Sequence, residues 1–261
     1  MLIVLRHSIF CSENQNTMKY SLVTTFVMMI MTTAFSQKDP DPKDTEVWEP
    51  EPEVVTPGNN PYAPPSDAIL LFDGKDLEHW IGEDGKSPRW TVAEGAMTVV
   101  KGTGDIKTKQ TFGDIQLHIE WRTPAKVEGE GQGRGNSGIF LSEKYELQIL
   151  DSYHNRTYSN GQAGSIYKQS IPMVNASKPP GTWQAYDVIF MAPKFNQDGS
   201  LASPGRITVL HNGIVIHHNT EIKGTTEYIG EPKIISHGKG AIRLQDHGNP
   251  TSFRNIWVRE L

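Results

Sequence analysis

The chain of 261 residues has a single cysteine, Cys11. Neither a disulfide framework nor a cysteine-ligated metal site is therefore available to the rest of the chain, and a cysteine nucleophile is excluded with them. Positive charge is also sparse, because the net charge is −5 and no run of Lys or Arg exceeds two residues. Nucleic-acid binding normally needs a basic patch or stripe, so we expect no nucleic-acid partner.

Helical periodicity is the next feature that the sequence lacks. No segment repeats apolar residues at the spacing of a helix face over three turns, and no internal repeat is present. Turn-forming residues are abundant instead, with 24 Gly and 17 Pro. Residues 115–122 alternate between apolar and polar, and two apolar stretches flank Asn212-Gly213, a strong hairpin signal. About ten to fourteen such short strands predict an all-β fold, a sandwich or jelly roll of two antiparallel sheets.

The N-terminal region has the order of a secretory signal peptide. Met18-Lys19 precedes an apolar run over residues 22–35, and small side chains stand just before Gln37. We predict a signal peptide within residues 1–36, translated from Met18 and cleaved near Ser36/Gln37. The run of about 14 residues is shorter than the roughly 20 that cross a bilayer, so no membrane span is expected. The mature protein is then expected to be exported, to the periplasm or out of a bacterial cell.

Residues 37–66 are rich in proline and acidic side chains, as in Trp48-Glu49-Pro50-Glu51-Pro52. Proline removes backbone donors and like charges repel, which predicts a disordered, extended linker. The composition changes at Asp67, where short apolar strands begin. We therefore expect one folded domain over residues 67–261.

Apolar and polar residues alternate over the stretch 145–149, which predicts a strand with Glu146 and Gln148 on one face. Polar groups on an inner sheet face cost free energy unless they are satisfied or used, so we expect this face to meet a ligand. The strand runs into a polar cluster that contains Asp151 and His154. Carboxylates and imidazoles are common general acids and bases. The candidate catalytic groups are therefore Glu146, Asp151 and His154.

Two further stretches present polar side chains in alternation, with Glu120 and Arg122 on one and Arg243 and Gln245 on the other. Carboxylates, amides and guanidinium groups offer the planar, paired hydrogen bonds that sugar hydroxyls need. A solvent-facing salt bridge is the alternative for any one of them. The full candidate set for substrate binding is Glu120, Arg122, Asn136, Gln148, Arg243, Gln245 and His247.

Glu146, Gln148 and Asp151 share the i, i+2, i+5 spacing of the E-x-D-x-x-E signature in laminarinase-like glucanases. Two features oppose that interpretation. Glutamine cannot ionise, and on a regular strand positions five apart face opposite sides about 16 Å from each other. Retaining glycosidases hold their two carboxyl groups about 5–5.5 Å apart. A glucanase would therefore need a β-bulge before Asp151.

The metal content stays open at this level. An Asp and a His lie close together in the sequence twice, three residues apart at Asp151 and His154 and adjacent at Asp246 and His247. Either pair could ligate a metal or exchange protons. Calcium held by loop oxygens is a common structural ion in exported β-proteins. No cofactor is certain, and a divalent metal, either structural calcium or a catalytic ion, is the one left open.

Several phrases of the sequence occur in an order that resembles the 3-keto-disaccharide hydrolase family, a bacterial family long described as a domain of unknown function. They are Leu71–Leu77, Gly135–Phe140, Tyr145–Asp151, Ile242–Gly248 and Phe253–Ile256. The resemblance covers residues 67–261. It implies a concanavalin-like (laminarinase-like) sandwich in an exported protein that acts on an oligosaccharide or 3-keto-glycoside.

The chemistry of such a substrate needs only one catalytic base. A ketone at C3 acidifies the hydrogen at C2, so the glycosidic bond can break by elimination and water can add afterwards. We expect Glu146 or His154 as the base and Asp151 as the acid or a metal ligand. Sugar oxygens or the enolate would then be bound by Gln148, Gln245 and Arg243. The alternatives are a non-catalytic carbohydrate-binding module, which can use the same fold, and a laminarinase-like glucanase.

Overall fold

The structure, a computed structural model, describes residues 39–261. The predicted signal peptide and its cleavage point lie outside the described residues. Contacts divide the chain into two units, residues 1–52 and residues 53–261. The described part of the first unit contains one short 3-10 helix, η1 (Pro42–Thr45), whose first turn is capped by Asp41. Within residues 39–261 no helix is long and apolar enough to cross a membrane.

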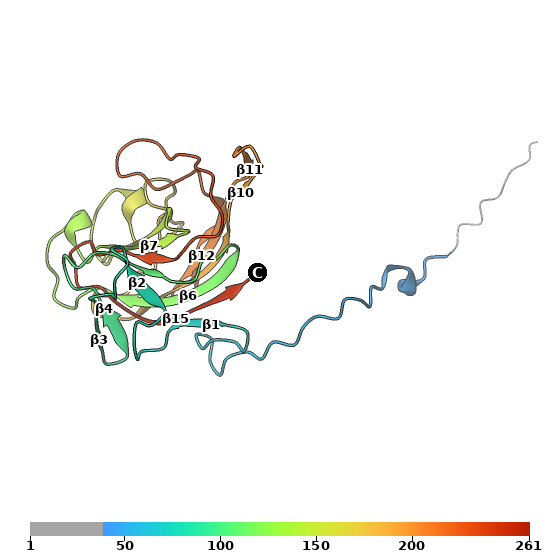
Figure 1. The fold of residues 1–261 in the computed structure, drawn as a ribbon, viewed down its shortest axis with the longest axis horizontal. Coiled ribbons are helices and arrows are strands. Elements are labelled where there is room, and N and C mark those ends of the chain that lie inside the picture. The colour runs from blue at the N-terminus through green and yellow to red at the C-terminus, as the bar shows by residue number, and fades with distance from the viewer. Residues whose placement is uncertain (1–38) are drawn as a thin grey trace, which may run out of the picture. The chain divides into compact units, whose positions relative to one another are not determined.

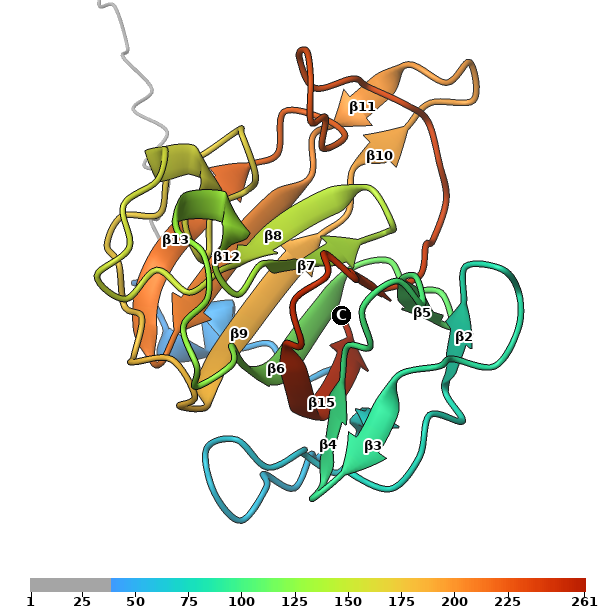
Figure 2. The same ribbon diagram turned by 90° about the vertical axis from the view of Figure 1, so that its left-hand side faces the viewer.

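The second unit contains two antiparallel sheets (Figures 1 and 2). The large sheet has eight strands, in the order β13 (Ile214–Glu221), β12 (Arg206–His211), β9 (Gln184–Met191), β6 (Ile115–Arg122), β15 (Ser252–Glu260), β4 (Ala96–Thr98) and β3 (Thr91–Ala93), with β1 (Ile69–Phe72) also paired to β15. The small sheet has five, in the order β2 (Trp80–Gly82), β5 (Ile106–Thr108), β14 (Arg243–Leu244), β7 (Ser137–Leu141) and β8 (Tyr145–Ile149). A separate ribbon joins β10 (Lys194–Phe195) to β11 (Leu201–Ser203). Two short 3-10 helices, η2 (Gly131–Gly133) and η3 (Ser159–Gly161), stand in the loops.

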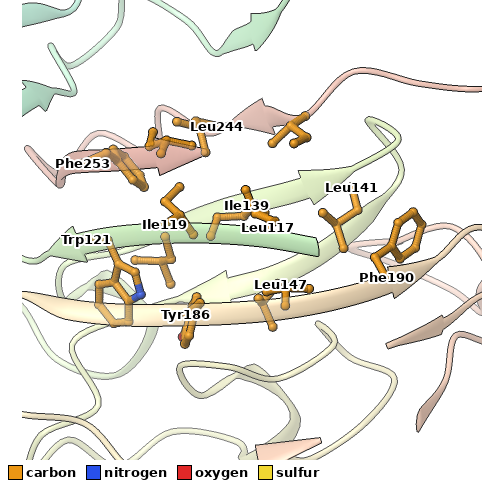
Figure 3. Close-up of a cluster of buried hydrophobic side chains, with 14 of the residues drawn as sticks. Leu117, Ile119, Trp121, Ile139, Leu141, Leu147, Tyr186, Phe190, Leu244 and Phe253 are labelled. Atoms are coloured by element: carbon orange, nitrogen blue, oxygen red, sulfur yellow. The ribbon is translucent and has the colours of Figure 1, made fainter. Parts of the chain in front are cut away.

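Alternating apolar side chains from the two sheets meet in one core (Figure 3). Side chains that point to opposite faces on successive residues let each strand bury one set and present the other. The large sheet supplies Leu117, Ile119, Trp121, Tyr186, Phe190 and Phe253, and the small sheet supplies Ile139, Leu141, Leu147 and Leu244. The predicted all-β sandwich of two antiparallel sheets is therefore confirmed.

The outer face of the large sheet is covered in part by a segment that precedes the strands. The ring of Tyr62 stacks on His118, and His118 stacks on Trp257, each at 5.4 Å between ring centroids. The backbone oxygen of Tyr62 accepts hydrogen bonds of 3.0 Å from Asn255 Nδ2 and Trp257 Nε1. Tyr62, which lies within the stretch 37–66 expected to be a linker, thus contacts the sandwich in this structure.

Candidate active site

Glu146 and Gln148 point away from the core on β8, as the alternation predicted, because Tyr145, Leu147 and Ile149 occupy the core side. The β7–β8 ladder has no register shift, so Glu146 lies opposite Phe140 and Gln148 lies opposite Gly138. On the other edge of β7, Arg243 of β14 lies opposite Phe140. Side chains directly opposite each other share a sheet face.

The segment 165–167 extends this ladder by one more short stretch. Gln148 N donates to Ser165 O at 3.0 Å, and Tyr167 N donates to Glu146 O at 3.1 Å. Between these bonds Leu147 forms an antiparallel bridge with Ile166. Tyr167 is thus the cross-strand neighbour of Glu146 and shares its sheet face.

These rows form one wall of a pocket of about 560 Å³ on the outer face of the small sheet. We call it the inner pocket. Its lining is polar and aromatic, with amides, tyrosines, one carboxylic acid and one imidazole. The lining residues are Gln132, Asn136, Phe140, Glu146, Gln148, Tyr158, Tyr167, Thr226, Tyr228, Gln245 and His247.

Glu146 is the single carboxylic acid among the described residues that line the inner pocket. Its side chain is buried, and none of the residues 39–261 hydrogen-bonds its carboxyl group. Burial penalises the ionised form and raises its pKa to about 8, against the weaker opposite effect of Arg243. Arg243 is a weak counter-charge because its guanidinium pairs with Asp105 and stacks 3.7 Å from the centroid of the Phe140 ring. A carboxyl in this state can take up a proton near neutral pH.

Space for that carboxyl depends on a glycine inside β7. A Cβ atom at Gly138 would stand 2.7 Å from Glu146 Oε1 and 3.1 Å from a ring carbon of Phe140. Any larger residue would push the carboxyl out of its place. The missing side chain at Gly138 therefore leaves the space that the Glu146 carboxyl occupies.

Two glutamines that line the inner pocket each have a buried amide oxygen without a partner among the described residues. Gln148 Oε1 and Gln245 Oε1 have no hydrogen-bond partner within the structure as described. The amide of Gln148 is fixed by its nitrogen, which donates to Gln132 Oε1 at 3.1 Å, and Gln132 Nε2 in turn donates to Gly161 O at 2.7 Å. Buried acceptors without donors are costly, and hydroxyl groups of a bound sugar would satisfy them.

His247 lies at the rim of the inner pocket with its ring exposed. Asp246 shapes the turn that presents it, because its carboxylate accepts from Gly248 N at 2.9 Å and from Gly104 N at 3.1 Å. Asn136 lies on the same side, and its backbone N–H donates to Asn249 Oδ1 at 2.8 Å. The sequence placed both His247 and Asn136 in the binding set, and the structure brings both to the pocket.

The structure does not bring Asp151 or His154 to this pocket. Asp151 is buried in an ion pair with Arg134, at 2.7 Å between Oδ2 and Nε, and lines a separate cavity of about 190 Å³. His154 is exposed and packs edge-on against Tyr153. The bulge that a glucanase would need is absent from Tyr145 to Ile149, where the ladder is regular. The two carboxyl groups therefore do not share a site.

Glu120 and Arg122 lie on β6, on the outer face of the large sheet and away from the inner pocket. Burial opposes ionisation of Glu120, but contacts from His118, Asn255 and Arg254 outweigh it and lower its pKa to about 2. The guanidinium of Arg122 lies 4.6 Å above the Trp183 ring. Alternation correctly assigned both side chains to a polar face, but it cannot say to which sheet that face belongs.

No group of three or more His, Cys, Asp or Glu residues among residues 39–261 is arranged to hold a metal ion. The Asp246–His247 pair in particular uses its carboxylate on backbone N–H groups.

Several pocket residues carried no sequence signal. These residues all lie in loops, where no alternation marks a face. They are Gln132, Tyr158, Tyr167, Thr226 and Tyr228. Tyr228 and Thr226 reach the pocket from the long connection between β13 and β14, and Thr226 Oγ1 accepts from Glu146 N at 2.9 Å. Only the folded chain brings these loops together.

The fold and the site together define a β-sandwich with a polar, aromatic-lined pocket suited to sugars. The chain belongs to the family of 3-keto-alpha-glucoside-1,2-lyase-like domains, whose family model matches residues 67–259. This confirms the resemblance carried by the sequence phrases.

Three relatives support the assignment. A 3-keto-disaccharide hydrolase from Bacteroides thetaiotaomicron is 23% identical over 249 residues, which is 74% of this chain and 78% of that protein. A crystal structure of a candidate glycosyl hydrolase from Parabacteroides distasonis is 53% identical, with a TM-score of 0.82 over 85% of this chain and 97% of that one. A second such structure from the same organism, 22% identical with a TM-score of 0.55 over 75% of this chain and 94% of that one, shows the fold alone. The family and these relatives indicate a carbohydrate hydrolase-like function.

Proposed function

We propose that this protein cleaves the glycosidic bond of neutral 3-keto-glycosides by elimination followed by hydration. The observation that carries the proposal is the lone carboxyl of Glu146, buried in a sugar-sized pocket with a pKa raised to about 8. A conventional glycosidase needs two carboxyl groups. Elimination beside a ketone needs one base, because the ketone itself accepts the electron pair of the C2–H bond.

The residues of the inner pocket can each be given a role in that reaction. Glu146 takes the C2 proton, and the electrons pass into the C3 ketone as an enolate. In this proposal, His247 at the rim donates a hydrogen bond to the developing oxyanion. The enolate then expels the leaving oxygen from C1, which gives an enone. Water adds at C1 while Glu146 returns its proton to C2.

The amides of the inner pocket are assigned to binding of the sugar hydroxyls. The pocket also selects against negatively charged sugars. Gln148 and Gln245 accept hydrogen bonds from sugar hydroxyls through their unpartnered oxygens. Neither Lys nor Arg is among the described residues that line the inner pocket, so a uronic acid would find no counter-ion there. Arg243 supports the pocket by packing on Phe140 and does not contact the substrate. We assign no chemistry to Asp151 or His154, and Glu120 and Arg122 contact no substrate in this scheme.

The test is product analysis by NMR in D₂O. The protein is incubated with a 3-keto-disaccharide and, separately, with the unoxidised parent, each with and without a chelator. Cleavage of the keto sugar alone is expected, and deuterium at C2 of the product above the enzyme-free control would show that the proton held by Glu146 exchanges with solvent before it returns to C2. Cleavage of the parent would instead support a glucanase, and saturable binding without turnover would support a carbohydrate-binding module. Loss of turnover with the chelator would require a metal that the scheme above does not contain.

Export completes the proposal. A disaccharide-cleaving enzyme with the predicted signal peptide would act outside the cytoplasm. The mass of the protein recovered from the periplasm or medium should correspond to a chain that begins at Gln37; recovery of uncleaved chain from the cytoplasm alone would contradict this.

A further inference from the structure

A second cavity adjoins the inner pocket and shares a wall with it. We call it the outer pocket; its volume is about 370 Å³. The two cavities have two lining residues in common, Tyr158 and Tyr167. The other residues of the outer pocket are Asn160, Lys168, Gln169, Glu227, Gly230, Glu231 and Pro232. The proposed function uses the inner pocket and leaves both this cavity and the two tyrosines unexplained.

The shared tyrosines are joined through their hydroxyl groups. The two phenolic oxygens are 2.6 Å apart, a short hydrogen bond. Tyr167 is fixed by the backbone ladder to β8 directly opposite Glu146, so its ring rises from the same sheet face as the proposed base. The hydroxyl pair thus stands at the boundary between the cavity that holds Glu146 and the cavity that does not.

A cation lies close to this pair. Lys168 Nζ is 5.7 Å from the ring centroid of Tyr167 and 6.0 Å from that of Tyr158, and it is 4.4 Å from the ring of Tyr228. Burial raises the pKa of both Tyr158 and Tyr167, so both hydroxyls carry their protons at neutral pH. A phenolate formed on either one would be stabilised by the other hydroxyl and by the ammonium group.

We propose that Tyr158 and Tyr167 form a linked acid that protonates the leaving oxygen, with the leaving half of the substrate seated in the outer pocket. This rests on the proposed function, in which the leaving oxygen has no other proton donor. The C1–O bond breaks as the phenolic proton moves to the leaving oxygen, so a neutral sugar departs and a phenolate shared by the two tyrosines remains. In the hydration step the attacking water gives one proton to that phenolate. Glu146 returns to C2 the proton that it removed in the first step. Both catalytic groups are thereby restored, and no oxidant or co-reactant is consumed.

The test varies the leaving group. A sugar alkoxide needs protonation, whereas 4-nitrophenolate is a stable anion that leaves without an acid. Tyr167→Phe removes one hydroxyl and keeps the ring. It should lower kcat/KM for a 3-keto-disaccharide about 10²–10⁴-fold, the usual contribution of a general acid. On the 3-keto 4-nitrophenyl glycoside the same variant should remain within a few-fold of wild type, and Tyr158→Phe should show the same split. Tyr153→Phe, outside both pockets, is the matched control and should leave kcat/KM unchanged for both substrates.

Each result decides. An equal loss on both substrates would show that the tyrosines only hold the pocket in shape, and an unchanged rate on the disaccharide would show that they donate no proton; either overturns this inference while the proposed function stands. If the wild-type protein turns over no 3-keto-glycoside, the proposed function falls and this inference with it. The seat of the leaving group is tested by Glu231→Trp, which should raise KM for the disaccharide more than for a methyl 3-keto-glycoside. Equal changes in KM for the two substrates would show that the leaving sugar does not bind in the outer pocket.

Discussion

The carboxyl of Glu146 gains little from Arg243, the cation that favours its ionised form. Arg243 lies on the same sheet face but is neutralised by Asp105, and the ring of Phe140 stands between Arg243 and the pocket. Burial is therefore the larger influence, and the carboxyl is far more basic than an exposed glutamate. A stronger base removes a C–H proton more readily, at the cost of being protonated in part at neutral pH.

Activity should consequently rise with pH. If Glu146 is the base, kcat/KM for a 3-keto-disaccharide increases as the carboxyl ionises, with the limb centred near pH 8. Glu146→Gln should lower turnover about 10²–10⁴-fold and abolish that limb. Rates measured from pH 5 to pH 10 check both. A rate that falls through the same range would mean that Glu146 works as an acid.

The same burial makes Glu146 a source of instability at high pH. Its pKa is about 8 in the folded protein, against 4.5 for an unperturbed glutamate, so the folded protein binds the proton more tightly than the unfolded chain does. The contribution of Glu146 to the free energy of unfolding is then greatest below pH 4.5 and is lost as pH rises through 8. Glu146→Gln removes this dependence, so at pH 9 the variant should be more stable than wild type by a few kcal/mol, at about 1.36 kcal/mol per pKa unit. Urea unfolding at pH 5 and pH 9 measures it, and an equal difference at both values would contradict the assignment.

At this scale the sequence predicted the site in part. Alternation placed Glu146, Gln148 and Gln245 on a ligand-facing surface, because a period of two is a backbone property that holds wherever the strand lies. Tyr158 and Tyr167 escaped notice because their positions depend on hydrogen bonds between the loop 158–167 and β8, which no local pattern records.

Among the elements, β7 makes room for the Glu146 carboxyl because Gly138 has no side chain. Gly138→Ala would place a methyl group 2.7 Å from Glu146 Oε1, and the carboxyl would have to move. A displacement of this size should lower kcat/KM about 10–100-fold. Gly133→Ala is the matched control, because a Cβ there meets nothing within 4 Å. Steady-state kinetics on both variants, with circular dichroism to verify folding, decides; equal activities would show that the carboxyl has room to spare.

The Gly-rich loop over residues 129–135 is fixed by Asp151, which follows the end of β8. Arg134 donates through Nε to Asp151 and through its other nitrogen to Tyr153 O at 3.0 Å, while Asp151 N donates to Arg134 O at 3.1 Å. This reciprocal arrangement holds the loop that carries Gln132 and Asn136 beside the inner pocket. It gives Asp151 a structural task that the sequence, which shows only spacing, could not distinguish from catalysis.

Asp151→Asn should therefore act on stability. It leaves a largely buried guanidinium without its counter-charge, at a cost of roughly 3 kcal/mol in the free energy of unfolding. Thermal unfolding measures the loss. The pH profile of kcat/KM should keep its shape, since Glu146 is untouched. Should the variant lose its rate on the disaccharide but keep it on the 4-nitrophenyl glycoside, Asp151 would be the acid instead of the tyrosine pair.

At the level of the elements, the sequence could not predict to which of the two sheets a strand belongs. The strands 115–122 and 145–149 both alternate cleanly, yet they lie in different sheets and face opposite sides of the core. Strand pairing is set by contacts far apart in the chain, such as β6 with β15, and alternation within one strand carries no record of its partner.

Across the whole sandwich, the two outer faces have different tasks. The small sheet exposes its polar face to the inner pocket, whereas the large sheet has His118 sealed between Tyr62 and Trp257. Burial alone would lower the pKa of His118, but the carboxylates of Asp187 and Glu120 raise it above its ordinary value. The imidazole is thus enclosed by two aromatic rings and by two carboxylates, and the carboxylates favour its charged form.

Removing one of those rings should weaken the fold without touching the pocket. Tyr62→Ala deletes a stacking partner and opens His118 to water, and we expect the free energy of unfolding to fall by about 1–3 kcal/mol. Because the raised pKa of His118 favours its charged form, the stabilisation is present below pH 6.5 and is lost as pH rises through the folded pKa. Opening His118 to water removes part of the burial that opposes its charged form, so the penalty of Tyr62→Ala should be smaller at pH 6 than at pH 9. Urea unfolding at both values tests this, and kcat/KM on the disaccharide should match wild type because the opposite sheet carries the site. A loss of activity in the folded variant would mean that the segment around Tyr62 communicates with the inner pocket through the core, and that the two faces are coupled.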